Sequence, residues 1–393
     1  MSSPSPTKIR EELSAYRETL LANALMLGEI PAPAGDESAR VRFLADRFNA
    51  LSLQGVSIDE AGNVQAMLPG RKGNQTILLA AHADTHITLR PGERLTINVT
   101  PEHLEGQGLA DNTVGLACLL SIPELLERLD IKLDANIIFL GHVNSLGSRD
   151  FAGLRFFLDH VPNPVHAGLV LEGISLGRLN PSCLGMVQAD IKCRVHQSPG
   201  TRWEASENAI VIMHRVIRRI LEIPVPQEPR TSVILGSLNA GKTFNRPPEA
   251  ARLRLEVRSE EPGKAREIRM QIQEIVREIS STTASEIDIS YPALRKPGGI
   301  PFSHPMVTAA REVMAELDVE TLIGPSYSDL SVLISHNIPA VTLGLTTAEA
   351  LNEPEERVEI EPYLTGIAQA VGVLQRIDKE VATYPEAEDP PIS

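Results

Sequence analysis

Histidine and carboxylate side chains follow apolar segments of the chain, where they could bind a metal ion. His82 and Asp84 come directly after the apolar segment 76–81. Residues two apart in a strand point to the same side, so the Asp84 carboxylate could hold one nitrogen of the His82 ring while the other binds a metal. An ordinary strand end that binds no metal also fits these residues.

Two further carboxylates strengthen the metal hypothesis. Asp111 begins the long apolar segment 112–129, and Glu172 ends the apolar segment 168–171. Imidazole and carboxylate groups are common ligands of zinc. Asp111 is also an ordinary helix N-cap residue, and Glu172 could be a solvated carboxylate at a strand end. The metal hypothesis therefore requires a fold that brings these two residues close to His82.

Continuous apolar runs alternate with segments of helical spacing, and these elements must position the candidate ligands. Runs without polar alternation are typical of strands buried on both faces. They occur at 76–81, 136–143, 168–171 and 340–345. Helical spacing occurs between them, at 112–129 and 305–317. The alternation predicts an α/β fold with a mostly parallel central sheet flanked by helices, in which ligands bind at the carboxyl ends of the strands.

The segment 186–293 has a different pattern. Its order of strand, helix, strand, strand, helix, strand predicts a ferredoxin-like α+β domain. We therefore expect this domain to be inserted into the first, whose two parts are 1–185 and 294–383. The last residues, 384–393, are rich in proline and acidic residues, and we expect them to be disordered.

Composition limits the class of protein. Of the 393 residues, 42% are hydrophobic and 22% are charged, which is ordinary for a globular protein. The net charge of −14, without a local basic patch, argues against a nucleic-acid partner. The N-terminus lacks the apolar core of a secretory signal, and we find no apolar run of the roughly 18 residues that a membrane span needs. The sequence predicts a cytoplasmic protein with no membrane partner.

Together these segments resemble the dinuclear zinc exopeptidase and deacylase family, which includes peptidase T, the aminoacylases and acetylornithine deacetylase. The resemblance extends over nearly the whole chain, through EIPAPAGDESARVRFLADRF, DEAGNVQA, LLAAHADTHI, GLADNTVG, VLEG and SYSDLSVLISHNIPAVTLG. It implies a zinc exopeptidase-like fold whose inserted domain is a lid and dimerisation domain. It also implies that His82 and Glu172 bind one metal, that Asp111 bridges two metals, and that Asp84 orients His82.

The resemblance assigns roles to residues of the inserted domain as well. It implies that His196 reaches the scissile carbonyl group, and that Asn245 and Arg258 bind the substrate carboxylate beside a turn at Gly241. A planar guanidinium suits this task because it meets a carboxylate with two parallel hydrogen bonds. From the residues alone, Arg258 could equally form a salt bridge on a strand face, and Asn245 could be a turn residue. A homodimer formed through this domain is a further implication.

One half of the family's site is missing. After the strand at 136–143 the family has two adjacent glutamates, a general base and a ligand of the second metal, whereas this chain has Asn144 and Ser145. Asn352 stands where the family has a histidine ligand of that same metal. Asparagine accepts no proton near neutral pH, and both replacements are weak zinc ligands. We therefore expect one zinc ion rather than two, or none.

Nearby side chains could substitute for the missing ligands. His142 shares the strand face of Asn144 but lies roughly 6 to 7 Å back along the strand, so it could also be a buried core histidine. Asp150 lies on the following loop, and His86 lies just beyond Asp84. Each of the three is a candidate ligand.

Three hypotheses about function remain open. The first is a protein that binds a peptide or an N-acyl amino acid at a one-metal remnant site, with amide hydrolysis absent or weak. The second is an active metal-dependent aminopeptidase, dipeptidase or N-acyl amino acid deacylase with recruited ligands. The third is a structural or regulatory dimeric scaffold. A carboxylate-binding pair argues against the scaffold, because a scaffold needs no such pair.

Overall fold

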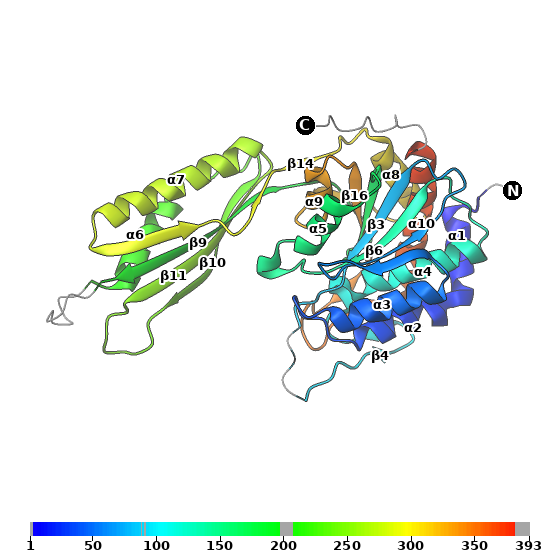
Figure 1. Ribbon diagram of the computed structural model, residues 1–393, viewed down its shortest axis with the longest axis horizontal. Coiled ribbons are helices and arrows are strands. Elements are labelled where there is room, and N and C mark those ends of the chain that lie inside the picture. Colours follow the sequence, from blue (N-terminus) through cyan, green and yellow to red (C-terminus); the bar gives the residue numbers. More distant parts are fainter. Residues whose placement is uncertain (1–2, 88, 90–91, 197–206, 382–393) are drawn as a thin grey trace. The chain divides into compact units, whose positions relative to one another are not determined.

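The computed structural model describes residues 3–87, 89, 92–196 and 207–381, and it divides into two units (Figure 1). The first unit combines the stretches 1–182 and 299–393, and the second is Cys183–Gly298. The sequence places the boundaries of the inserted domain at 186 and 293. The second unit is slightly longer because β13 (Leu294–Arg295) pairs with β9 (Gly185–Val195). The predicted disordered tail at 384–393 lies outside the described residues.

A nine-stranded sheet forms the centre of the first unit, in the order β1-β2-β6-β3-β7-β16-β8-β14, with β15 paired to β8. The strands are β1 (Gln54–Ile58), β2 (Val64–Leu68), β3 (Thr76–His82), β6 (Asn136–His142), β7 (Ala167–Ile174), β8 (Arg178–Cys183), β14 (Gly298–Gly299), β15 (Leu322–Ser326) and β16 (Ala340–Thr346). Strand β3 is parallel to β6 and β7, and β7 is parallel to β16. The predicted parallel arrangement is confirmed for these four central strands, whereas β1 with β2, β2 with β6 and β8 with β16 pair antiparallel, so the sheet as a whole is mixed.

Helices cover both faces of this sheet, which explains why its central strands are apolar throughout. Along β3, Ile77 and Leu79 pack into one hydrophobic cluster, while Leu78 and Ala80 pack into another. The first cluster includes residues of α1 (Pro6–Leu13), α2 (Arg17–Gly28), α3 (Ser38–Ala50), α4 (Val114–Arg128), α8 (Pro305–Glu316) and α10 (Ile360–Val381). The second includes residues of α5 (Ala152–His160) and α9 (Leu330–Ser335).

One apolar helical stretch differs from the sequence expectation about membrane spans. Leu109–Arg128, which contains α4, is long and apolar enough to cross a membrane by length and composition. Most of it is buried inside the first unit, as is usual for the core helix of a folded domain. Its apolar character is therefore explained by packing on the central sheet.

A small four-stranded sheet, in the order β17-β18-β5-β4, was not anticipated from the sequence. Its strands are β4 (Asn98–Val99), β5 (His103–Glu105), β17 (Ala348–Glu349) and β18 (Arg357–Glu359). It joins the segment before α4 to the segment after β16 by antiparallel pairing of β5 with β18. This pairing brings the loop that contains Asn352 close to the loop before Asp111.

The second unit has the predicted ferredoxin-like order. Its elements are β9, α6 (Ala209–Leu221), β10 (Thr231–Ala240), β11 (Ala250–Ser259), α7 (Pro262–Ser281) and β12 (Ser285–Ser290). The sheet order β10-β11-β9-β12 is antiparallel throughout, and α6 and α7 pack on one face (Figure 1). Leu253, Leu255 and Val257 of β11 point to the helices, and the residues between them form the other face. The predicted α+β inserted domain is confirmed.

Candidate metal centre

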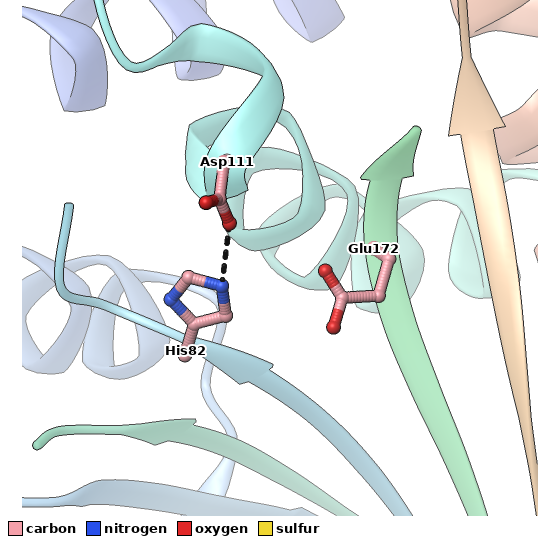
Figure 2. Close-up of side chains that lie close together, drawn as sticks. All are labelled: His82, Asp111 and Glu172. Atoms are coloured by element: carbon pink, nitrogen blue, oxygen red, sulfur yellow. Dashed lines mark hydrogen bonds and ion pairs between the residues drawn. The ribbon is translucent and has the colours of Figure 1, made fainter. Parts of the chain in front are cut away.

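Three candidate ligands meet at the carboxyl edge of the central sheet. His82 ends β3, and Glu172 lies near the end of the neighbouring parallel strand β7. Asp111 belongs to the irregular turn Leu109–Thr113 before α4. Figure 2 shows the three side chains pointing toward one another. One ligand atom from each residue lies within 4.8 Å of the others. His82 Nε2 lies 3.0 Å from Asp111 Oδ1.

The arrangement fits a divalent metal ion. Two ligand atoms of one tetrahedral zinc ion are about 3.4 Å apart, given bonds near 2.1 Å, so the observed spacing needs only a small adjustment. His82 and Glu172 are buried, and all three residues line a cavity of about 380 Å³. Within the described ranges, no other three His, Cys, Asp or Glu residues meet this spacing. Three protein ligands facing a cavity leave a fourth position for water or substrate.

Asp84 holds both His82 and the loop after β6. His82 Nδ1 lies 2.9 Å from the carbonyl oxygen of Asp84 and 3.4 Å from Asp84 Oδ1. A carbonyl oxygen only accepts, so Nδ1 carries the proton and a neutral ring leaves Nε2 free for a metal. Asp84 Oδ2 accepts the backbone N–H groups of Ser145 and Leu146 at 2.9 and 2.7 Å. Burial alone would raise the pKa of Asp84, but His82 and the N–H of Leu146 outweigh it and lower the pKa to about 2.

Without a metal, the site retains protons. Burial opposes a charge on His82, but its hydrogen bonds with Asp111 and Asp84 outweigh burial and raise the pKa of His82 well above its usual value. Burial is also the main cause that raises the pKa of Glu172 to about 7, and the carboxylates of Asp329 and Asp111 add to it. A metal ion must displace these protons, because it binds a neutral imidazole and an ionised carboxylate.

We therefore expect divalent metal binding to release protons and to strengthen as the pH rises through about 7, where Glu172 loses its proton, and further at higher pH, where His82 loses its own. At lower pH both groups are protonated and compete with the metal, and each lost proton removes that competition. Titration calorimetry with zinc, in buffers that differ in ionisation enthalpy, measures the number of protons released. A binding enthalpy that is the same in every buffer would contradict this expectation.

The replacements at 144 and 352 suit the local backbone. Asn144 has φ of 57° and Asn352 has φ of 63°, in the left-handed region that asparagine tolerates better than most residues. The backbone N–H of Asn144 donates to Glu37 Oε1 at 3.1 Å, and that of Asn352 donates to Glu356 Oε2 at 2.9 Å. Asn144 Oδ1 is buried and has no hydrogen-bond partner among the described residues.

The three side chains considered as substitute ligands, His142, Asp150 and His86, do not belong to the cluster. His142 uses both ring nitrogens elsewhere: Nε2 lies 3.0 Å from Asp329 Oδ2, and Nδ1 lies 3.0 Å from Ser145 Oγ. Asp150 accepts a hydrogen bond from Arg155 at 3.2 Å. His86 lies nearest, with Nε2 at 3.8 Å from Asp111 Oδ2, and its side chain is about half exposed. Recruitment of His142 as a ligand would require the hydrogen bond of the coordinating nitrogen to break, either to Asp329 or to Ser145.

The candidate substrate-binding residues lie in the second unit. His196 is exposed directly after β9, with Nε2 3.7 Å from Glu286 Oε2. Arg258 lies on the helix-free face of β11, where it forms an ion pair with Glu256. Asn245 is exposed in the loop after β10, and Gly241 begins that loop with φ of 73°, a conformation that favours glycine. The roles assigned to these residues stay predictions.

Two buried carboxylates near the cluster were missed from the sequence. Asp329 lines the same cavity as the three ligands. Glu356 accepts the backbone N–H groups of Gly108, Ala110 and Asn352 at 3.2, 2.6 and 2.9 Å, so it holds the turn that carries Asp111. An acidic residue directly before an apolar helix was a weak signal for Asp329. Nothing in the sequence separates Glu356 from the other glutamates of its loop.

Comparisons with known proteins agree with this fold. Residues 63–222 match the model of peptidase family M28, and residues 185–283 match that of the peptidase dimerisation domain. Among curated proteins, none matches the chain by sequence. The similarity to known proteins therefore rests on these two domain matches and on the structure.

Solved structures of peptidases share the fold over most of their length. A tripeptidase from Staphylococcus aureus has 20% identity and a TM-score of 0.77, covering 92% of this chain and 99% of its own. Aminopeptidase PepT from Bacillus cereus has 18% identity and a TM-score of 0.73, covering 92% and 98%. A dinuclear metal-binding peptidase of the M20 family from Bacillus subtilis has 17% identity and a TM-score of 0.67, covering 94% and 99%. The resemblance seen in the sequence is confirmed.

Proposed function

Because the chain has the fold of the dinuclear metallopeptidases and matches their dimerisation domain, we propose that it is a one-metal relative that binds a peptide or an N-acyl amino acid. One observation carries the proposal. The cluster of His82, Asp111 and Glu172 is complete, while Asn144 and Asn352 stand where the resemblance expects acid–base and ligand groups. We further propose that the ion is zinc and that one ion binds per chain.

The chain's own residues then determine what the site can do. A bound zinc ion would polarise a carbonyl group and lower the pKa of a water molecule. Asp84 keeps Nε2 of His82 free to bind it, and Glu172 supplies a carboxylate from the neighbouring strand β7. A positioned general base typically contributes about 10² to 10⁴ in rate, and Asn144 cannot take that role. We therefore propose that amide hydrolysis is weak.

The inserted domain completes the proposal. His196 would contact the substrate carbonyl group, and Asn245 and Arg258 would bind its carboxylate beside the turn at Gly241. Homodimerisation through this domain and a cytoplasmic location are parts of the same proposal. An active aminopeptidase, dipeptidase or deacylase is the alternative, and it requires a proton acceptor other than residue 144.

The experiment that tests this function compares zinc-loaded and zinc-free protein. Dipeptides, tripeptides and N-acetyl amino acids are screened for binding by calorimetry and for cleavage by mass spectrometry. We expect binding that is lost when zinc is removed, together with slow cleavage. Rapid cleavage would favour the active enzyme, and absence of binding to every probe would contradict the proposal.

The carboxylate-binding role of Arg258 gives a separate prediction. Arg258→Ala is expected to weaken binding of a carboxylate-bearing probe by about 2 kcal/mol or more, the scale for removing one member of a desolvated charge pair. Arg254→Ala is the matched control, because Arg254 lies on the same face of β11 and is exposed. The probe is one that binds the wild type, and its amide derivative should not distinguish the variants. Equal affinity of the two variants for the carboxylate would exclude the role.

A further inference from the structure

A fourth acidic side chain faces the candidate metal site. Asp329, directly before α9, is fully buried and lines the same cavity as His82, Asp111 and Glu172. Its Oδ1 atom is buried and has no hydrogen-bond partner among the described residues. Leaving a buried polar atom without a partner is unfavourable, so such an atom beside a cavity indicates a ligand or water that binds it.

The other oxygen of Asp329 is held by a chain of hydrogen bonds. His142 Nε2 lies 3.0 Å from Asp329 Oδ2, and His142 Nδ1 lies 3.0 Å from Ser145 Oγ. An ionised carboxylate only accepts, so Nε2–H donates to Asp329, and in a neutral ring Nδ1 then accepts from the Ser145 hydroxyl. All three residues are buried, which fixes the direction of the carboxylate. Ser145 therefore has a definite use at a position where the resemblance expects a metal ligand.

The geometry separates Asp329 from the direct ligands. It is not part of the group whose ligand atoms all lie within 4.8 Å, although it shares their cavity. His142, its partner, pairs with His82 across β3 and β6, and the two rings are 6.3 Å apart. A carboxylate that shares the cavity but lies outside the ligand group acts on a cation through a bridging water molecule and through its charge. Such outer partners commonly tune metal affinity.

We propose that Asp329, held by His142 and Ser145, is the outer carboxylate of the metal site and binds the water molecule on the cavity side of the ion. This inference rests on the proposed metal-binding function. Asp329 then gives the cavity a carboxylate, which the uncharged amide of Asn144 cannot supply. Asp329 and His142 are then positioning residues, because they act through water rather than by direct coordination.

The test uses zinc alone and needs no substrate. Asp329→Asn keeps the shape of the side chain and one acceptor for His142 but removes the charge, and His142→Gln frees the carboxylate. We expect each variant to bind zinc about 10- to 100-fold more weakly than the wild type by calorimetry. Asp159→Asn is the matched control, because Asp159 forms an exposed pair with His336 at the same 3.0 Å separation. Its zinc affinity should equal that of the wild type.

Two readouts distinguish this role from a purely structural one. In EDTA, the melting temperature of Asp329→Asn should equal that of the wild type, whereas added zinc should raise it less. The visible absorption of bound cobalt should also differ between the two proteins, because the water on the ion loses its acceptor. Equal zinc affinity in Asp329→Asn and the wild type would overturn the inference and leave the proposed function intact. A wild type that binds no zinc would instead overturn the proposed function and the inference with it.

Discussion

His82→Ala is expected to weaken divalent metal binding by more than about 100-fold, beyond the usual effect of removing an outer partner. The reason is that His82 supplies the one nitrogen of the cluster, with Nε2 already 3.0 Å from the carboxylate of Asp111. Removing it leaves two carboxylates, Asp111 and Glu172, which no longer surround the ion. Zinc titration calorimetry measures the loss.

His86→Ala is the control for this variant. His86 is about half exposed and its ring nitrogen lies 3.8 Å from Asp111, so it is the nearest histidine that could replace His82. An exposed pair of this kind contributes little. We expect His86→Ala to bind zinc nearly as well as the wild type. If the two variants lost affinity equally, the ligand set would have to include His86.

Glu356→Ala is expected to lower the free energy of unfolding by at least about 2 kcal/mol. The carboxylate accepts three backbone N–H groups, of which those of Gly108 and Ala110 are buried, and each buried N–H left without an acceptor costs about 1 to 3 kcal/mol. The donors at Gly108 and Ala110 fix the turn that carries Asp111. We therefore also expect weaker zinc binding, although Glu356 is not a ligand. Urea denaturation of the zinc-free protein measures the first effect.

Glu356→Gln separates charge from geometry. The amide keeps one oxygen acceptor but cannot accept all three hydrogen bonds. The free energy of unfolding of Glu356→Gln should therefore lie between that of Glu356→Ala and that of the wild type. Glu353→Ala is a suitable control, because Glu353 is exposed in the same loop. A loss of stability in Glu353→Ala as large as in Glu356→Ala would show that the loop, and not its buried carboxylate, stabilises the turn.

The fold could be predicted because its elements have distinct patterns. Strand β3 contacts helices on both faces, so its residues are apolar without alternation. Strand β11 has helices on one face only, and buried residues therefore alternate with polar ones. The small sheet had no such signal. Its strands β4 and β17 have two residues each, too few to show any period.

The candidate ligands could be proposed from the sequence because each stands at the end of an apolar segment. Their supporting residues could not. Asp329 and Glu356 lie far along the chain from His82 and Asp111, and their importance depends on tertiary packing. His142 shows the same limit. The sequence suggested that His142 could be a metal ligand. The structure shows instead that its two ring nitrogens are hydrogen-bonded to Asp329 and Ser145.

The most direct test of the account is the metal content of the chain after dialysis against zinc, measured by plasma mass spectrometry. The account predicts one zinc ion per chain in the wild type and none in His82→Ala. Two ions per chain would show that other residues replace the ligands missing at Ser145 and Asn352, and would contradict the one-metal site. No bound zinc in the wild type would contradict a metal site altogether.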